Sequence, residues 1–326
     1  MTVPPNRTAA AGRPARTVFL GSGTFAVPIL RALLADDGFE VVGVVTPPDR
    51  PAGRRGEPAA VPIAAEARRA GVPLLQPERI RTPESAAAIA ELRPDLGVLA
   101  DFGRIVPPSI LAIPTHGILN VHPSLLPRHR GATPIPATIL AGDAEAGVSV
   151  MVMDAGLDTG SVLGARSWSL LGSETAPALE TRAGAEGAAL LRELVPAYLS
   201  GERAPVPQDE ARATLTRPLR REDGRLDPAH SATELERHVR AYEPWPGSWV
   251  EPPAGRLAVA RAEVAPSEPG DATGALVADG DGLALVTSDG RLRLLELQPA
   301  GGRRMSGATF RRGHPTVVGQ LVGGPT

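Results

Sequence analysis

Apolar and polar positions along the first two thirds of the chain predict strands and helices in turn. The expected strands are short runs that are apolar on both faces, which is typical of strands buried in a parallel sheet. The expected helices repeat apolar residues at i, i+3, i+4 and i+7, as in the stretch 26–33. Strands are expected at 17–20, 40–45, 73–76, 96–100, 118–122, 148–153 and 161–170, and helices near 26–33 and at 61–70, 83–91, 135–140 and 174–199. This order predicts an α/β domain with a mainly parallel sheet that helices cover on both faces.

The pattern changes after about residue 200. Pro205 and Pro207 lie among polar side chains, which indicates a linker. Ser231 and Glu234 then form a capping box that begins a helix, and from Arg256 onward strands are separated by Asp-Gly hairpin turns. We therefore expect a small β-rich second domain. The expected segments are a disordered N-terminal extension at 1–15, the α/β domain at 16–203, a linker at 204–218, the β-rich domain at 219–316 and a tail at 317–326.

A glycine-rich turn, Gly21-Ser22-Gly23, follows the first expected strand. With Ala26 it matches the pattern G-x-G-x-x-A, which also occurs in dinucleotide-binding folds. A dinucleotide site would carry an acidic residue at the end of the second strand, but Thr46 and Pro47 stand there. We therefore interpret these residues as a tight turn between a strand and a helix.

The composition narrows the available chemistry. The 326 residues include 34 basic residues, all of them arginine, and no cysteine. Disulfides, thiolate nucleophiles, lysine Schiff bases and P-loop lysines are thereby excluded. The net charge of −2 gives no global sign of nucleic-acid binding, so any RNA contact must come from a local basic patch. No apolar run approaches the roughly 18 residues of a membrane span. We expect a cytoplasmic protein, and a monomer because no long apolar surface helix is evident.

Candidate chemistry centres on the expected strand 118–122. Asn120 and His122 lie two residues apart, so both point to the same face of the strand, and Pro123 ends it. The carboxyl ends of strands are where open α/β sheets bind their ligands. Taken alone, however, His122 could equally be a buried structural histidine.

Two aspartates, Asp154 and Asp158, follow the expected strand 148–153 in a glycine-rich loop. This loop lacks the further oxygen ligands of an EF-hand, and the alternative is a carboxylate carried against the Asn120/His122 strand. The six histidines are scattered without a metal-ligand spacing, and no G-x-S-x-G hydrolase motif is present. Asn can hold an oxyanion, and His can donate to it or move a proton. With an aspartate, this set suits acyl transfer to an amine without a covalent intermediate.

Residues 46–56 form a stretch rich in Pro and Gly that carries Arg50, Arg54 and Arg55. Its composition predicts a loop without regular structure. The arginines are either ordinary solvated residues or a basic arm beside the carboxyl ends of the strands. The residues alone leave both interpretations open.

The run Asn120-Val121-His122-Pro123-Ser124-Leu125-Leu126-Pro127, followed by Arg130-Gly131, resembles the signature of the 10-formyltetrahydrofolate-dependent formyltransferases. Asp158 lies 38 residues after Asn120, where that family carries its catalytic aspartate. Further matches resemble the branch of the family that acts on methionyl-tRNA. They are the basic loop at 46–54, the element at 130–135, and the C-terminal stretches 240–246 and 297–301.

The resemblance implies a Rossmann-like formyltransferase domain, a linker and an OB-like C-terminal domain that helps to bind tRNA. It implies formyl transfer from 10-formyltetrahydrofolate to the α-amine of initiator methionyl-tRNA, without a metal. Asn120 and His122 would stabilise the tetrahedral intermediate, and Asp158 would assist proton transfer. The residues implied in folate binding are Ser124, Leu125, Leu126, Pro127, Phe102, Gly103, Arg104 and Asp154. Those implied in tRNA binding are Arg50, Arg54, Arg55, Arg303 and Arg304, with Arg311 and Arg312 nearby in sequence.

Two alternatives remain at this point. The acceptor could be an amino-sugar nucleotide or another small amine, or the chain could bind folate or RNA without catalysis. The chain also departs from the methionyl-tRNA branch, with Pro123 for Gly, His129 for Trp or Tyr, Asp101-Phe102 for Ala-Tyr, and no lysines after Arg55. We interpret His129 as a partly exposed packing residue.

Overall fold

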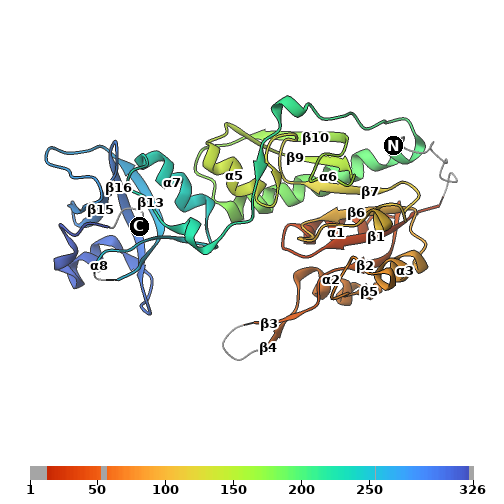
Figure 1. Ribbon diagram of the computed structural model, residues 1–326, viewed down its shortest axis with the longest axis horizontal. Helices are drawn as coiled ribbons and strands as arrows, with labels where there is room; N and C mark the ends of the chain where they lie inside the picture. The colour runs from red at the N-terminus through yellow and green to blue at the C-terminus, as the bar shows by residue number, and fades with distance from the viewer. Residues whose placement is uncertain (1–12, 53–56, 254, 323–326) are drawn as a thin grey trace. The chain divides into compact units, whose positions relative to one another are not determined.

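The computed structural model describes residues 13–52, 57–253 and 255–322. Their contacts divide the chain into two compact units (Figure 1). The first comprises the described residues up to 134 together with 145–169 and 180–216, and the second comprises 135–144, 170–179 and 217 onward. Most of the predicted N-terminal extension lies outside the described residues, but Ala15 already begins the first strand.

The first unit is built on a seven-stranded sheet with the order β10-β9-β7-β6-β1-β2-β5. Five of these strands pair in parallel, while β9 runs antiparallel to both β7 and β10. The strands are β1 (Ala15–Gly21), β2 (Phe39–Val45), β5 (Leu74–Leu75), β6 (Leu96–Ala100), β7 (Ile118–His122), β9 (Glu145–Val152) and β10 (Val162–Ser169). The prediction of a mainly parallel α/β domain is confirmed.

The helices named next also lie close to the predicted positions, except for the short helix α4, which was not predicted. They are α1 (Ala26–Leu34), α2 (Pro62–Ala70), α3 (Pro83–Glu91), α4 (Pro108–Leu111), α5 (Pro134–Ala141) and α6 (Ala176–Ser200). On one face of the sheet, Val18 of β1 packs in a cluster with Ile89 of α3 and Ile110 of α4. On the other face, α6 crosses β7 so closely that a Cβ at Gly187 would lie 2.7 Å from Val121 Cγ1. A glycine is therefore required where α6 packs against the strand that carries the site.

The turn after β1 brings the backbone close to the neighbouring strand. A Cβ at Gly21 would lie 2.9 Å from the carbonyl oxygen of Ala100, at the end of β6. The first glycine of the G-x-G-x-x-A pattern thus allows a close approach between β1 and β6. This agrees with the interpretation as a tight strand-to-helix turn.

The prediction that residues 46–56 lack regular structure is wrong for residues 50–52, holds for 46–49, and for 53–56 concerns residues outside the described ranges. Strands β3 (Arg50–Ala52) and β4 (Glu57–Ala59) form a two-stranded antiparallel hairpin in which Pro51 lies opposite Pro58. Opposed residues in an antiparallel ladder alternate between hydrogen-bonded and non-hydrogen-bonded pairs. Two prolines can occupy a non-hydrogen-bonded pair without removing a ladder bond, so here they do not act as breakers.

The predicted linker 204–218 is largely part of the first unit. Val206 exchanges backbone hydrogen bonds of 2.8 Å with Val162. The short η1 turn (Glu210–Arg212) follows, and β11 (Leu215–Thr216) pairs in parallel with β8 (Arg130–Gly131). The proline-rich composition reflects an extended segment that lies on the fold rather than a free connection.

The second unit is a small antiparallel sheet with the order β12-β13-β16-β15-β14, to which β17 adds beside β16. This unit also includes nearly all of α5 and the start of α6. Its elements from residue 217 onward are η2 (Arg221–Gly224), α7 (Ala232–Ala241), β12 (Ser248–Val250), β13 (Leu257–Ala265), β14 (Leu276–Asp279), β15 (Gly282–Val286), β16 (Arg291–Pro299), β17 (Met305–Ser306), α8 (Gly307–Gly313) and η3 (Pro315–Val317). The predicted β-rich domain is confirmed. Its capping box is present, since Glu234 N donates to Ser231 Oγ and Ser231 N donates to Glu234 Oε2.

In the part of the chain that the structure describes, no helix combines the length and apolar character needed to cross a membrane.

Candidate active site

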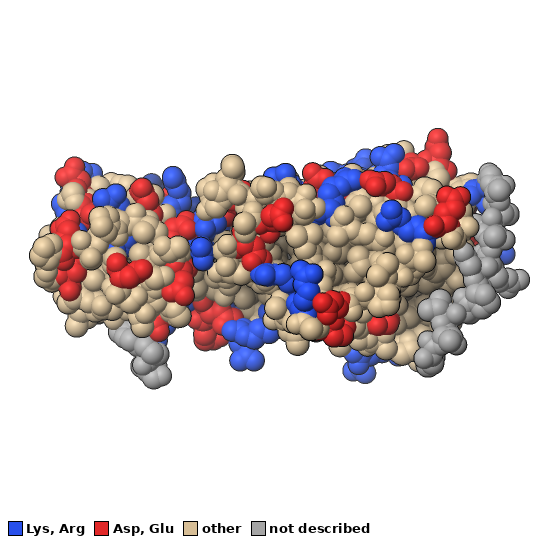
Figure 2. Space-filling view, turned by 90° about the horizontal axis from the view of Figure 1, so that it is seen from above, with Lys and Arg blue, Asp and Glu red and all other residues tan. Residues whose placement is uncertain are grey.

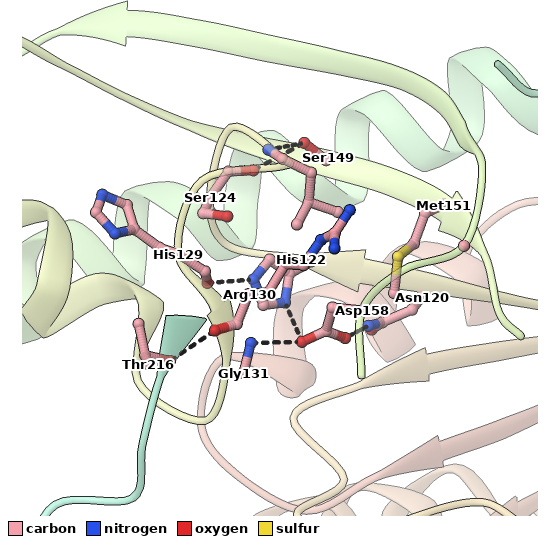
Figure 3. A network of polar contacts seen from close by, with 12 residues as sticks. Asn120, His122, Ser124, His129, Arg130, Gly131, Ser149, Met151, Asp158 and Thr216 are labelled. Carbon is pink, nitrogen blue, oxygen red and sulfur yellow. Dashed lines mark hydrogen bonds and ion pairs between the residues drawn. The ribbon is translucent and has the colours of Figure 1, made fainter. Parts of the chain in front are cut away.

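Strand β7 carries Asn120 and His122 to one point at its carboxyl end (Figure 3). The strand is central, between β6 and β9, and all five of its residues are buried. Because side chains alternate along a strand, Val121 faces α6 while Asn120 and His122 face the opposite side. Each of the two polar residues is only 5% exposed.

The loop after β9 brings Asp158 to this pair. Asp158 Oδ1 accepts a hydrogen bond of 3.2 Å from Asn120 Nδ2, and its Oδ2 accepts one of 2.7 Å from Gly131 N. Its φ of +54° lies in the left-handed region, which L residues rarely adopt unless the surrounding structure holds them there. The three residues predicted to act together therefore meet at one place, and each carboxylate oxygen faces a different donor.

The ring of His122 is held by a backbone carbonyl on one side and faces Asp158 on the other. Its Nε2 lies 3.0 Å from the carbonyl oxygen of His129. Because a carbonyl can only accept, Nε2 carries a proton, and Nδ1 is the nitrogen left for chemistry. Nδ1 lies 3.7 Å from Asp158 Oδ2. Burial lowers the pKa of His122, against the opposing effect of the Asp158 charge, so its Nδ1 is an unprotonated acceptor at neutral pH.

The prediction that His129 is a partly exposed packing residue is wrong in its exposure. The side chain is buried at 8% exposure, and the backbone has a φ of +57°. This conformation turns its carbonyl oxygen toward the ring of His122. The contribution of His129 to the site therefore comes from its backbone, which no side-chain pattern in the sequence indicates.

Arg130 follows in the same turn and is 3% exposed. Its guanidinium forms a bidentate ion pair with Glu210, at 2.8 Å and 2.7 Å, and this pairing raises the pKa of Arg130. Gln208 Oε1 accepts two further bonds from the same guanidinium. Sequence reasoning missed Gln208 and Glu210 because they lie in the segment predicted to be a linker. The only available signal was a polar run without glycine between Pro207 and Thr214.

The turn after β7 places the predicted folate residues in two different settings. Ser124 is buried, and its hydroxyl donates to the carbonyl oxygen of Arg128 at 2.6 Å. Its role is therefore to close the turn. Leu125, Leu126 and Pro127 remain half-exposed and present apolar surface beside the site strand.

The remaining predicted folate residues surround the ends of β6 and β9. Phe102 is 2% exposed and packs in the core, whereas Gly103 is exposed with a φ of +66°. Arg104 donates to the carbonyl oxygens of Pro77 and Glu78. Asp154 accepts from Gly156 N and Thr159 Oγ1, which fixes the loop that carries Asp158. Near Phe102, the exposed residues are Asp101 and Gly103.

The predicted tRNA residues are less well placed by the structure. Arg54 and Arg55 lie outside the described residues, and Arg50 lies in β3. Arg303 and Arg304 are exposed between β16 and β17, and Arg304 lies 3.8 Å from Glu296. Figure 2 shows arginines interspersed with acidic residues over the face in view, in agreement with the net charge of −2.

Within the described ranges, no three His, Asp or Glu side chains gather closely enough to hold a metal ion. The polar groups at the end of β7 are instead hydrogen-bonded to one another. Their arrangement offers an amide N–H, an imidazole nitrogen and a carboxylate at one point. This is a set that can stabilise a developing oxyanion and move a proton.

Comparison with known proteins places these residues in a family. A sequence model of the formyl transferases matches residues 15–195, and a model of the formyl transferase C-terminal domain matches residues 218–315. The methionyl-tRNA formyltransferase of Roseiflexus castenholzii is 46% identical over 310 residues, which cover 95% of this chain and 99% of the relative. That of Myxococcus xanthus is 44% identical, over 93% of this chain and 96% of the relative.

Solved structures share the fold at lower identity. The N-formyltransferase of Helicobacter canadensis, in complex with folinic acid and dTDP-3-aminofucose, is 17% identical with a TM-score of 0.62, covering 86% of this chain and 98% of that one. HypX of Aquifex aeolicus in complex with tetrahydrofolic acid is 17% identical with a TM-score of 0.59, covering 91% of this chain and 47% of that one. These similarities support the architecture of the chain.

Proposed function

The chain belongs to the formyl transferase family, and within it to the methionyl-tRNA formyltransferases, so we propose that it transfers the formyl group of 10-formyltetrahydrofolate to the α-amine of initiator methionyl-tRNA. The observation that carries the proposal is the convergence of Asn120, His122 and Asp158 at the end of β7. Identity above 40% over almost the whole of two methionyl-tRNA formyltransferases supports the acceptor.

The first catalytic task is to stabilise the oxyanion that forms when the amine attacks the formyl carbon. Asn120 Nδ2 donates one of its two N–H groups to Asp158, which fixes the amide plane and leaves the second N–H for the oxyanion. A donor that is already oriented needs no rearrangement during the reaction. We therefore assign to Asn120 the hydrogen bond to the oxyanion from the moment the amine attacks the formyl carbon.

The second task is to remove a proton from the attacking amine. With Nε2 held by the carbonyl of His129, Nδ1 of His122 is free to accept that proton. The resulting imidazolium lies beside the Asp158 carboxylate, which stabilises its charge, and the new Nδ1–H can donate to the oxyanion. Collapse of the intermediate then breaks the bond between the formyl carbon and N10 of the folate, and the proton is delivered to N10.

The residues around the site fit a folate as the formyl donor. Leu125, Leu126 and Pro127 offer half-exposed apolar surface for a flat ring, and the backbone at Gly103 is exposed for hydrogen bonding. Asp154 holds the second loop through Gly156 N. The buried hydroxyl of Ser124 is occupied within its turn, so Ser124 would support the pocket without contacting the folate.

The acceptor can be tested directly. The purified chain is expected to formylate charged initiator methionyl-tRNA in the presence of 10-formyltetrahydrofolate, and to leave a dTDP-amino sugar essentially unmodified. The measurement is incorporation of labelled formyl into each acceptor at equal concentration. Formylation of the amino sugar alone would overturn the proposed acceptor while leaving the reaction type intact, and labelling of neither would overturn the proposal.

Binding of tRNA is expected to depend on salt, because contacts between arginine and phosphate release counterions. Replacing Arg303 and Arg304 by alanine should weaken tRNA binding and reduce the slope of log Kd against log salt by about 1 for each of the two arginines that binds a phosphate. The matched control is Arg192→Ala, since Arg192 is already paired with Asp36 in the first unit. Unchanged affinity and slope in the double variant would exclude these two arginines from the tRNA interface.

We propose that the protein acts in the cytoplasm as a monomer, where charged initiator tRNA and folate are available for translation initiation. The hydrogen bonds that join Asn120, His122 and Asp158 to each other and to the backbone form within one chain.

A further inference from the structure

Residues 206–216, here called the strap, contact the loop of Asp158 and the side chain of Arg130. The strap enters at Val206, which pairs with Val162 of β10, and leaves through β11, which pairs with β8. Between these points its side chains reach the loop of Asp158 and the guanidinium of Arg130. A segment predicted as a linker is therefore in contact with two elements of the site.

Gln208 is the residue of the strap that contacts both elements. Its Nε2 donates to the carbonyl oxygen of Asp158 at 2.8 Å and to that of Gly160 at 2.7 Å. Its Oε1 accepts from Arg130 Nε at 3.0 Å and from Arg130 Nη2 at 2.9 Å. Both N–H groups and both lone pairs of the amide are thus used.

The four hydrogen bonds define one orientation of the amide. If the amide were flipped, its N–H groups would face the N–H groups of Arg130, and its oxygen would face the two carbonyl oxygens. A glutamate could accept from Arg130 but could not donate to the carbonyls of Asp158 and Gly160. Glutamine is therefore matched chemically to both neighbours at once.

Arg130 is itself fixed in place. Its guanidinium pairs with Glu210, and its backbone N donates to Thr214 O at 2.9 Å. Its carbonyl oxygen accepts from Thr216 Oγ1 at 3.0 Å (Figure 3). Gln208 thus connects the backbone of Asp158 to Arg130, which other residues of the strap hold through its side chain and its backbone. Since the φ of Asp158 is +54°, the loop needs such support to keep its conformation.

We propose that Gln208 is a positioning residue for the reaction: by holding the carbonyls of Asp158 and Gly160 against Arg130, it sets the separation of Asp158 Oδ2 and His122 Nδ1. The amide of Gln208 is hydrogen-bonded within the protein, so we assign it no contact with the formyl group or the amine. Its kinetic consequence rests on the proposed function, but its effect on the His122–Asp158 pair does not.

The test uses Gln208→Leu and Gln208→Glu, with Gln320→Leu in the second unit as the matched control. In Gln208→Leu we expect kcat to fall by about 10- to 100-fold with KM for both substrates nearly unchanged, because a small displacement of a catalytic group is costly. Gln208→Glu keeps the acceptor for Arg130 but cannot donate to either carbonyl, so it should not restore kcat. If Gln208→Leu fails to fold, the kcat of Gln208→Glu still tests the inference.

A second readout does not need turnover. The Asp158 charge opposes the lowering of the His122 pKa, so moving Asp158 away should lower that pKa further. Titration of labelled imidazoles by NMR is expected to show this downward shift for His122 in both Gln208 variants and not in Gln320→Leu. An unchanged His122 titration, or wild-type kcat in Gln208→Glu, would overturn the inference. Failure of the wild-type chain to transfer formyl would overturn the proposed function instead, and the titration would still decide the role of Gln208.

Discussion

Replacing Asp158 by asparagine is expected to lower kcat for formyl transfer by about 10³-fold, within the range that positioned acid–base groups contribute. Asp158 accepts from Asn120 Nδ2 at one oxygen and from Gly131 N at the other. An asparagine must turn its NH2 group toward one of these two donors, so one contact becomes repulsive. The negative charge beside His122 is also removed, and with it the stabilisation of the His122 imidazolium.

Folate binding provides the internal control for this variant. The Asp158 carboxylate is hydrogen-bonded to the protein, whereas the surface proposed to bind the folate is the apolar one at Leu125 and Leu126. The Kd for 10-formyltetrahydrofolate should change by less than about threefold, in keeping with an effect confined to the chemical step. The matched substitution is Asp36→Asn, since Asp36 also accepts from a backbone N–H and from a side chain, at the opposite end of the strands. A kcat for Asp158→Asn within tenfold of wild type would refute the assigned role.

The sequence predicts the centre of the site because that part depends on local rules. Strand alternation alone places Asn120 and His122 on one face of β7, and the apolar residues around them predict a buried strand. The meeting with Asp158 depends on β9 lying beside β7, which strand periodicity does not specify. For that contact the family resemblance was needed.

The features that could not be predicted are mostly backbone groups and segments whose composition is typical of a linker or a loop. The carbonyl of His129 and the N–H of Gly131 bind the side chains of His122 and Asp158, yet almost every residue has such groups. Gln208 lies among prolines and charged residues that are typical of a linker, and only the three-dimensional structure shows that its amide is fully bonded. In the same way, the prolines of residues 46–59 predict a loop, yet Pro51 and Pro58 occupy opposite positions in the ladder between β3 and β4.

His122→Gln is expected to lower kcat by about 10²- to 10³-fold and to abolish the acid limb of its pH profile. In the proposed mechanism, the amine loses its proton to an unprotonated Nδ1, so kcat should fall as the pH drops and His122 becomes protonated. Because burial lowers the pKa of His122, this fall is expected below the ordinary histidine value of 6.5. Glutamine can donate to the oxyanion through its amide, but it cannot accept and hold a proton.

The control for His122→Gln is His116→Gln. Burial also lowers the pKa of His116, but its ring lies against Tyr198 with ring centroids 6.5 Å apart, away from the end of β7. That variant should keep both the wild-type kcat and the acid limb. If the limb persists in His122→Gln, another group removes the proton from the amine, and the role of His122 is reduced to orienting Asp158. If the limb disappears only in His122→Gln, the proton passes through Nδ1, the one ring nitrogen that the backbone leaves free.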